Sequence, residues 1–200
     1  MKRRKYKKIR LRTANLTHPV ELEVMQRFIK KFNLKKGLEF GSKVGWSTSW
    51  IADELENNDG SLVTVDIIQY PEFIDNIKLS EVNPIQIIGH SGTESIKKEI
   101  AKYGPFDFVF IDGGHIYTEV KSDLDLAISL ADEMCMIFLH DIELDREDRQ
   151  MGVIKVFEDY PGFKLTFKEP NFCSATRRVS SCPSRFFLLF QNSIHQLLAI

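Results

Sequence analysis

Two glycines and two acidic residues in the first third of the chain have the spacing of a ligand-binding loop. An apolar stretch containing Glu39 is followed by Gly41 and Gly45, and a helical pattern begins directly after them. Glycine lets a backbone turn sharply and lets a ligand approach closely, because it has no Cβ atom. A second apolar run, Leu62–Val65, ends in Asp66, whose carboxylate can accept hydrogen bonds from a ribose diol. Strands that lead through such loops into helices build nucleotide sites in α/β sheets, so these residues predict a site for an adenosine-containing ligand.

The spacing of this loop distinguishes between classes of ligand. The dinucleotide fingerprint G-x-G-x-x-G places glycines where the backbone contacts a pyrophosphate. Here the glycines Gly41 and Gly45 are four residues apart, and Glu39 before them would repel a pyrophosphate. A carboxylate in that place favours a cationic ligand.

A second group of polar residues follows two later apolar runs. One run ends in Asp112 with His115 three residues on, and the next ends in His140 and Asp141. Adjacent parallel strands lie about 4.8 Å apart, so these side chains can converge at one edge of a sheet. Two carboxylates with imidazoles nearby can bind a divalent cation, with oxygen ligands favouring Mg²⁺ or Mn²⁺ and imidazole also accepting Zn²⁺ or Fe²⁺.

The hydrophobic pattern along the chain alternates between strand and helix. Strands are predicted at 37–40, 62–65, 85–88, 106–111, 134–139, 163–167 and 186–190. Helices are predicted at 20–32, 47–57, 71–79, 91–102, 117–130 and 146–160. This order predicts an α/β fold with a doubly wound, mostly parallel seven-stranded sheet and helices on both faces. Asp123 and Asp125 on the fifth of these helices are expected on its solvated face or as caps.

Composition and length limit the class of protein. The chain has 200 residues, of which 43% are hydrophobic and 28% charged, as expected for one soluble globular domain. Its three cysteines show no C-x-x-C spacing, which favours a reducing compartment. No apolar run reaches the roughly 20 residues that span a bilayer. We therefore expect a cytoplasmic protein with no membrane partner.

The first residues carry an unusual charge. Eight of the first twelve residues are Lys or Arg, and we interpret residues 1–17 as a basic N-terminal tail. A block of like charge is usually solvated, although it can also contact RNA phosphates or an acidic patch on a second subunit. Nucleic acid and a homodimer therefore stay open as partners. The net charge of −1 leaves the remaining residues acidic and without a whole-domain attraction to nucleic acid.

The pattern E-x-G-x-x-x-G-x-S-T that starts at Glu39 resembles motif I of the class I S-adenosylmethionine-dependent methyltransferases. The resemblance implies a Rossmann-like methyltransferase fold, with residues 18–200 as a single methyltransferase-like domain. It also implies that the loop passes under the amino-acid end of the cofactor, that Glu39 pairs with its ammonium group, and that Asp66 holds the ribose hydroxyls. The residues that the resemblance assigns to the cofactor are Glu39, Gly41, Ser42, Gly45, Asp66, His90, Ser91 and Asp112.

The run from Ile111 resembles the I-D-G-x-H-x-Y-x-x-V-x-x-D signature of a methyltransferase subfamily. That group includes small-molecule O-methyltransferases and enzymes described as cephalosporin hydroxylase-like. Together the motifs extend the resemblance over residues 38–160. In metal-dependent relatives such as catechol O-methyltransferase, acids after the fourth and fifth strands hold Mg²⁺. By that resemblance Asp112 and Asp141 are the candidate metal ligands, while His140 departs from an all-oxygen set.

These residues predict transfer of a methyl group to an oxygen of a small-molecule acceptor. Methyl transfer is an in-line displacement, so positioning supplies much of the rate. We expect Asp112 and Asp141 to orient the acceptor hydroxyl or a metal. Either His115 or His140 then takes the hydroxyl proton, because a neutral imidazole is a suitable base near neutral pH.

Three alternatives come from other classes of function. An RNA-directed methyltransferase is consistent with the basic start, although the Asn/Asp-Pro-Pro-Tyr/Phe sequence of amino-methylating enzymes is absent after the fourth strand. A non-catalytic Rossmann-like binding module is consistent with the fold alone. An NAD-dependent oxidoreductase is disfavoured by the missing G-x-G and by the lack of a Tyr-x-x-x-Lys pair.

Overall fold

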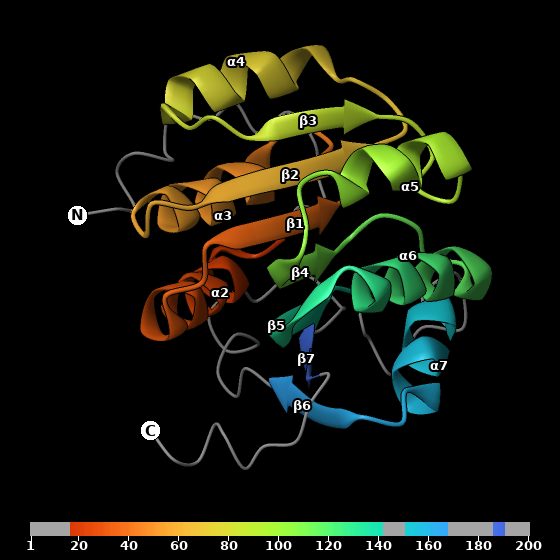
Figure 1. The fold of residues 1–200 in the computed structure, drawn as a ribbon. Coiled ribbons are helices and arrows are strands. Elements are labelled where there is room, and N and C mark those ends of the chain that lie inside the picture. The colour runs from red at the N-terminus through yellow and green to blue at the C-terminus, as the bar shows by residue number, and fades with distance from the viewer. Residues whose placement is uncertain (1–16, 142–150, 168–185, 191–200) are drawn as a thin grey trace, which may run out of the picture.

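The computed structural model describes residues 17–141, 151–167 and 186–190 and contains a seven-stranded sheet flanked by helices (Figure 1). The strands are β1 (Lys36–Phe40), β2 (Ser61–Asp66), β3 (Ile85–Ile88), β4 (Phe106–Ile111), β5 (Ala131–Leu139), β6 (Phe163–Phe167) and β7 (Phe186–Phe190). The helices are α2 (Pro19–Phe32), α3 (Trp46–Glu56), α4 (Pro71–Ser80), α5 (Glu94–Ala101), α6 (Tyr117–Ser129) and α7 (Met151–Asp159).

The strand order is β3-β2-β1-β4-β5-β7-β6. The strands β1 to β5 pair in parallel, whereas β7 is antiparallel to both β5 and β6. The chain adds strands outward from β1 to β3 and then returns to place β4 on the other side of β1. This reversal makes a switch point between β1 and β4, where open α/β sheets bind ligands beyond the carboxyl ends of their strands. The predicted doubly wound, mostly parallel sheet is thus confirmed.

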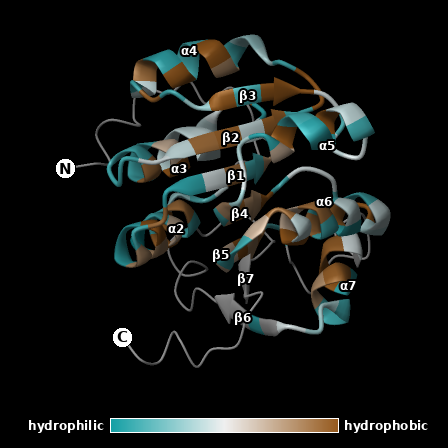
Figure 2. Cartoon of the chain, viewed as in Figure 1, coloured by the Kyte–Doolittle hydropathy of each residue, from teal (hydrophilic) through white to brown (hydrophobic). Residues whose placement is uncertain are grey.

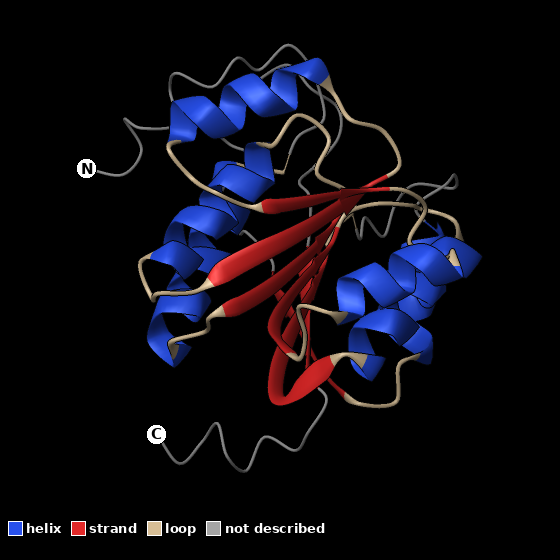
Figure 3. Ribbon diagram, turned by 45° about the horizontal axis from the view of Figure 1, so that its top comes forward, coloured by secondary structure: helices blue, strands red, loops and turns tan. Residues whose placement is uncertain are grey.

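Two layers of helices cover the two faces of the sheet, with α2, α3 and α4 on one face and α5, α6 and α7 on the other (Figure 3). Alternate residues of β4 enter opposite layers, because successive strand side chains point to opposite faces. Phe108 and Phe110 pack with α2 and α3, while Val109 and Ile111 pack with α6 and α7. A strand buried on both sides is mostly apolar, and β4 is largely coloured hydrophobic in Figure 2, whereas β1 is partly hydrophilic.

The start of α2 is fixed by a capping box. His18 accepts a hydrogen bond from the Val20 N–H through Nδ1, and the Glu21 carboxylate accepts one from the His18 N–H. Pro19 suits the first helical position because its φ is already helical and it lacks only an unneeded N–H. This cap matters for the site, because it brings Thr17 and Glu21 to the carboxyl edge of the sheet.

The loop between β1 and α3 depends on both of its glycines. Gly41 has φ +92° and Gly45 has φ +80°, and L side chains rarely adopt such values. A Cβ atom on Gly41 would also collide with the backbone of Asp112 after β4, and one on Gly45 would press on Phe73 and Ile77 of α4. Gly41 therefore allows the loops after β1 and β4 to come into direct contact, and Gly45 allows α4 to pack against the loop after β1.

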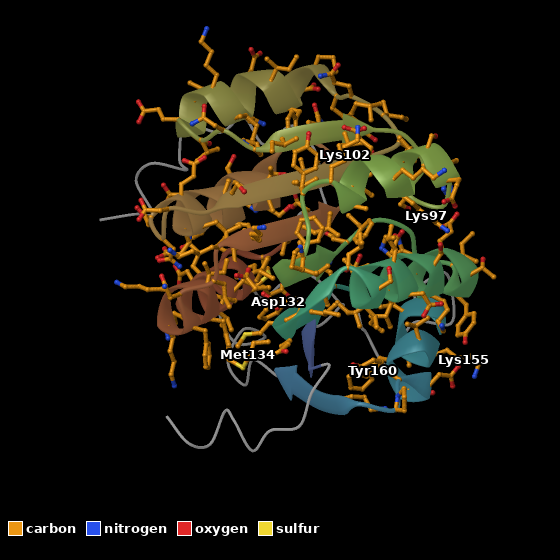
Figure 4. The ribbon with its side chains drawn as sticks, viewed as in Figure 1. Lys97, Lys102, Asp132, Met134, Lys155 and Tyr160 are labelled. Atoms are coloured by element: carbon orange, nitrogen blue, oxygen red, sulfur yellow. The ribbon has the colours of Figure 1, made fainter. Side chains whose placement is uncertain are left out.

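The predicted boundaries differ from the observed ones by more than one residue at three elements. β5 begins at Ala131 rather than 134. The hydrophobic pattern missed this start because Asp132 and Glu133 are polar and exposed. Asp132 and Met134 lie at the end of the sheet opposite the site in Figure 4. α5 begins at Glu94, since the preceding residues form a turn that Thr93 closes onto His90. α7 begins at Met151, and the first part of its predicted range, 146–150, lies outside the described residues, as do residues 1–16 of the predicted basic tail. Within the described ranges, no helix is long and apolar enough to cross a membrane.

Candidate active site

The polar residues that follow the central strands meet at one edge of the sheet. Phe40 of β1 pairs with Ile111 of β4, and Ile111 pairs with Leu139 of β5, so the next residues of each strand are neighbours. Backbone hydrogen bonds continue past the strand ends, from Asp112 N–H to the Phe40 carbonyl at 2.9 Å and from His140 N–H to the Ile111 carbonyl at 3.0 Å. The convergence predicted for the residues after these strands is therefore present.

The His–Asp cluster consists of Asp112, His115, His140 and Asp141. His140 Nδ1 lies 3.0 Å from Asp112 Oδ1 and 3.2 Å from Asp141 Oδ1. His115 Nε2 lies 2.7 Å from Asp141 Oδ2. Asp141 leaves β5 with φ +60°, a left-handed value that Asp tolerates better than most residues. This turn lets one carboxylate contact both imidazoles.

Charge in this cluster holds the buried imidazole of His140 in its protonated form. Burial opposes protonation, but Asp112, followed by Asp141 and Glu21, outweighs it and raises the pKa of His140 well above its usual value. Burial likewise opposes ionisation of Asp141, yet its hydrogen bonds to His115 and His140 hold its pKa far below the usual range. The hydrogen bond to Asp141 raises the pKa of His115. The cluster therefore contains an internal cation balanced by surrounding carboxylates.

Two residues at the start of α2 complete the cluster, and sequence reasoning missed both of these contacts. Glu21 Oε2 lies 3.2 Å from His140 Nε2, and the Thr17 hydroxyl donates to Asp112 Oδ2 at 3.1 Å. These partners are separated by 119 and 95 residues, respectively. The sequence offered no signal for Glu21 beyond its place in the helix cap. Its other oxygen, Oε1, is buried with no hydrogen-bond partner.

Glu39 lies fully buried beneath the glycine loop. Its carboxylate accepts hydrogen bonds from the hydroxyls of Ser47 and Thr48 on α3, each at 2.6 Å, and from Thr64 on β2 at 2.7 Å. Burial raises its pKa to about 7, against the opposing effect of these hydroxyls. The Ser and Thr of the E-x-G-x-x-x-G-x-S-T pattern are therefore the hydrogen-bond partners of its Glu.

Asp66 faces the same loop from the end of β2. It accepts hydrogen bonds from the Lys43 N–H at 2.7 Å, the Ser42 hydroxyl at 3.4 Å and the Ile68 N–H at 3.2 Å. The following residues, Ile67 and Ile68, are 64% and 52% exposed, which is unusual for large apolar side chains. Asp66 is thus oriented by the loop and bordered by apolar surface.

His90 and Ser91 follow β3, and a further acid joins them. His90 is exposed and its Nδ1 accepts the Gly92 N–H, whereas the Ser91 hydroxyl donates to Asp123 Oδ1 at 2.5 Å. The expectation that Asp123 is solvated was wrong: only 5% of it is exposed, and the hydrogen bond from the half-buried Ser91 hydroxyl makes this burial tolerable. Asp125 is exposed and pairs with Lys121, as expected of a solvated face.

Three of these groups could hold a divalent cation. Asp112, His115 and Asp141 each offer one ligand atom, and these atoms all lie within 4.8 Å of one another. Two carboxylates and an imidazole suit such an ion by type. However, all four carboxylate oxygens already have a partner among Thr17, His115 and His140 within 3.2 Å.

A model of a protein family described as a methyltransferase domain matches residues 38–142. The chain belongs to this methyltransferase family. The matched range contains the glycine loop, Asp66 and the whole His–Asp cluster, and it confirms the family predicted from the two motifs. No curated protein matches this methyltransferase in sequence.

Solved methyltransferases share the fold. An O-methyltransferase from Bacillus cereus in complex with SAH superposes with a TM-score of 0.70 at 19% identity, over 89% of this chain and 83% of that one. The O-methyltransferase TomG from Streptomyces achromogenes, in complex with SAM, gives 0.67 at 16% identity, over 88% and 82%. The SAH-bound methyltransferase PaMTH1 from Podospora anserina gives 0.65 at 16% identity, over 94% and 87%. These likenesses show that the methyltransferase domain has its expected fold.

Proposed function

We propose that this protein transfers a methyl group from S-adenosylmethionine to an oxygen of a small-molecule acceptor. The observation that carries the proposal is the position of the His–Asp cluster beside the glycine loop at the switch point of the sheet. Titratable groups and a glycine loop lie together at the carboxyl edge of the sheet, which is where open α/β sheets bind ligands. The solved O-methyltransferases with similar folds are complexes with SAH and SAM, which supports the same cofactor here.

The residues on the β1 and β2 side fit this cofactor by charge and position. When bound, S-adenosylmethionine supplies an electrophilic methyl group on a cationic sulfur. Asp66 is oriented by backbone N–H groups of its loop, which leaves its carboxylate placed to accept hydrogen bonds from a ribose diol. Glu39 of β1 precedes Gly41 and Gly45, and the positive charge of a bound cofactor would favour the ionised form of its buried carboxyl group, whose pKa is raised to about 7. The loop with His90 and Ser91 borders the nucleoside end.

His115 is the residue we assign as general base. His140 is 7% exposed and both of its ring nitrogens face carboxylates, so it has no nitrogen to offer an acceptor. His115 has 34% of its side chain exposed, and Asp141 holds its Nε2 in place. A base oriented by a carboxylate and open to solvent can accept the hydroxyl proton, which leaves the acceptor oxygen free to attack. Asp112 orients that hydroxyl. The hydrogen bond to Asp141 raises the pKa of His115. The neutral form that accepts a proton is therefore reached at a higher pH than in a free imidazole.

Metal assistance is the second candidate, favoured by the grouping of Asp112, His115 and Asp141. These three would hold the cation, and a bound cation would lower the pKa of the acceptor hydroxyl. Its binding would compete with the protein partners that each carboxylate oxygen now has. Calorimetric titration with Mg²⁺, Mn²⁺ and Zn²⁺, and methyl transfer in the presence of EDTA, decide between the base and the metal.

Calorimetry with S-adenosylmethionine, S-adenosylhomocysteine and NAD tests the cofactor class directly. We expect both sulfur nucleosides to bind and NAD to give no heat. Labelled methyl transfer is then measured against phenols, catechols and RNA, which separates a small-molecule acceptor from an RNA acceptor. Binding of NAD without either sulfur nucleoside would refute the proposal, and cofactor binding without transfer to any acceptor would favour a binding module.

A further inference from the structure

Asp123 has no role in the proposed chemistry so far, although it is paired with Ser91 in the loop that borders the nucleoside end. Asp123 is a carboxylate with 5% exposure on α6, and its partner is a half-buried hydroxyl in the loop after β3. The short Oγ–Oδ1 distance of 2.5 Å marks a strong hydrogen bond of the charge-assisted type. A buried carboxylate costs free energy unless it is paired, and the Ser91 hydroxyl supplies the partner of Asp123.

An ionised carboxylate can only accept hydrogen bonds, and a serine hydroxyl has a single hydrogen to donate. Because Asp123 takes that hydrogen, Ser91 Oγ can offer a ligand only its lone pairs. Burial raises the pKa of Asp123 to about 6, with the hydrogen bond from Ser91 and the nearby His90 acting against this and Glu119 adding to it. The carboxyl group is therefore ionised at about pH 8, two units above its pKa.

The pair lies at the nucleoside end of the crevice. Asp66 of β2 pairs with Ile88 of β3, so the loop that carries Ser91 begins one strand away from the proposed ribose site. Ile67 and Ile88 are 64% and 42% exposed beside these strand ends and provide apolar surface for a flat base. On the other side, a Cβ atom on Gly113 would lie 3.6 Å from Asp123 Oδ2, so the pair also borders the loop after Asp112.

We propose that Asp123 commits Ser91 to accept a hydrogen bond from the 6-amino group of a purine, and so makes the site select adenine over 6-oxopurines. The inference rests on the proposed S-adenosylmethionine site and names the residue that sets its base selectivity. Asp123 acts through Ser91 and is a positioning residue. A 6-oxo group would place its own lone pairs against those of Ser91, leaving both acceptors without a hydrogen.

The test compares the binding of S-adenosylhomocysteine with that of its 6-oxo counterpart, S-inosylhomocysteine, by calorimetry at about pH 8, where Asp123 is ionised. The wild-type protein should bind the amino compound at least about tenfold more tightly, as expected when a polar contact is left unmade. In Asp123→Asn, the amide can donate to Ser91, so the hydroxyl can turn toward an oxo group. The preference should then fall severalfold, mainly through tighter binding of the inosine compound.

Two further variants separate this role from a structural one. Ser91→Ala removes the acceptor and should bind both compounds within about threefold of each other. Asp125→Asn, an exposed acid on the same helix, should keep the wild-type preference. Equal binding of both compounds to the wild-type protein, or a full preference in Asp123→Asn or Ser91→Ala, would overturn the inference alone. Failure of the wild-type protein to bind either compound would instead overturn the proposed function.

Discussion

The two halves of the crevice satisfy the hydrogen bonds of their acids by different means. On the β1 and β2 side, the partners of Glu39 and Asp66 are neutral hydroxyls and backbone N–H groups. On the β4 and β5 side, the partners of Asp112 and Asp141 are mainly imidazoles. Neutral donors add no positive charge to offset a carboxylate, whereas imidazolium ions balance the carboxylates that they contact.

The pKa values of Glu39 and Asp141, one acid from each half, shift in opposite directions. Burial raises the pKa of Glu39 to about 7, while His115 and His140 overcome burial and hold the pKa of Asp141 far below its usual range. The partners of Glu39 and Asp66 are neutral, so a cationic cofactor would supply positive charge that these partners do not. On the other side the charges of imidazolium and carboxylate already balance, and Asp141 holds His115, the proposed proton acceptor, in place. Four variants test whether the halves act separately.

The largest effect is expected for Asp112→Ala on the acceptor side. Loss of this carboxylate removes the group that orients the acceptor and one partner of His140, so kcat should fall about a thousandfold or more. The dissociation constant of S-adenosylhomocysteine should stay within about threefold, because its binding depends on the other half. Asp125→Ala, which removes an exposed acid, is the control. Undiminished turnover in Asp112→Ala would contradict the assignment.

Glu39→Gln should change how stability depends on pH. Folding raises the pKa of Glu39 from 4.5 to about 7, so the native state favours its protonated form. Its contribution to stability is complete below pH 4.5, declines as the pH rises through about 7, and is constant above that. Urea denaturation should therefore show a wild-type loss of about 3 kcal/mol over this range that Glu39→Gln lacks. Glu158→Gln, on the exposed side of α7, should behave as wild type.

Asp66→Ala should weaken cofactor binding without changing the chemistry step. Removal of the carboxylate that faces the ribose should raise the dissociation constant of S-adenosylhomocysteine about tenfold or more by calorimetry. At saturating cofactor, kcat should be retained. Asp75→Ala removes an exposed acid from α4 and serves as the matched control. An unchanged dissociation constant would remove Asp66 from the site.

Gly152→Ala tests whether α7 positions the base. A Cβ atom there would collide with backbone atoms of His115, Ile116 and Tyr117, so α7 rests directly on the loop that carries the base. We expect kcat to fall roughly tenfold through displacement of His115, with cofactor affinity unchanged. Gly60→Ala creates a similar collision with Lys35 at the other end of the sheet and should lower stability without lowering kcat. Equal losses of kcat in both variants would indicate a general effect on folding.

The fold could be predicted because its elements have clear hydrophobic periods. The nearly all-apolar runs at 106–111 and 134–139 identified strands covered on both faces, and the polar residues directly after them were expected to meet at one edge. The alternation of strands and helices predicted that the sheet is mostly parallel and covered by helices on both faces. The predicted start of β5 was late only because its exposed end is polar, as residues outside the covered part of a sheet are.

The contacts that could not be predicted come from other parts of the chain. Glu21 had a sufficient local explanation as a capping residue, so nothing in the sequence indicated that it also contacts His140. Asp123 looked solvated because an acid on a helix usually is, and only the Ser91 hydroxyl from another loop makes its burial tolerable. Gly152 gave no signal, since its small size matters only against a backbone distant in sequence.

The left-handed backbone conformation of Asp141 limits which residues can replace it. Asp, Asn and Gly are the residues that enter this conformation most readily, and Asp and Asn have nearly the same shape. A single exchange to Asn would therefore keep the chain path and remove the charge that holds His115. In the proposed mechanism, this exchange would remove the group that orients the base while leaving the fold intact.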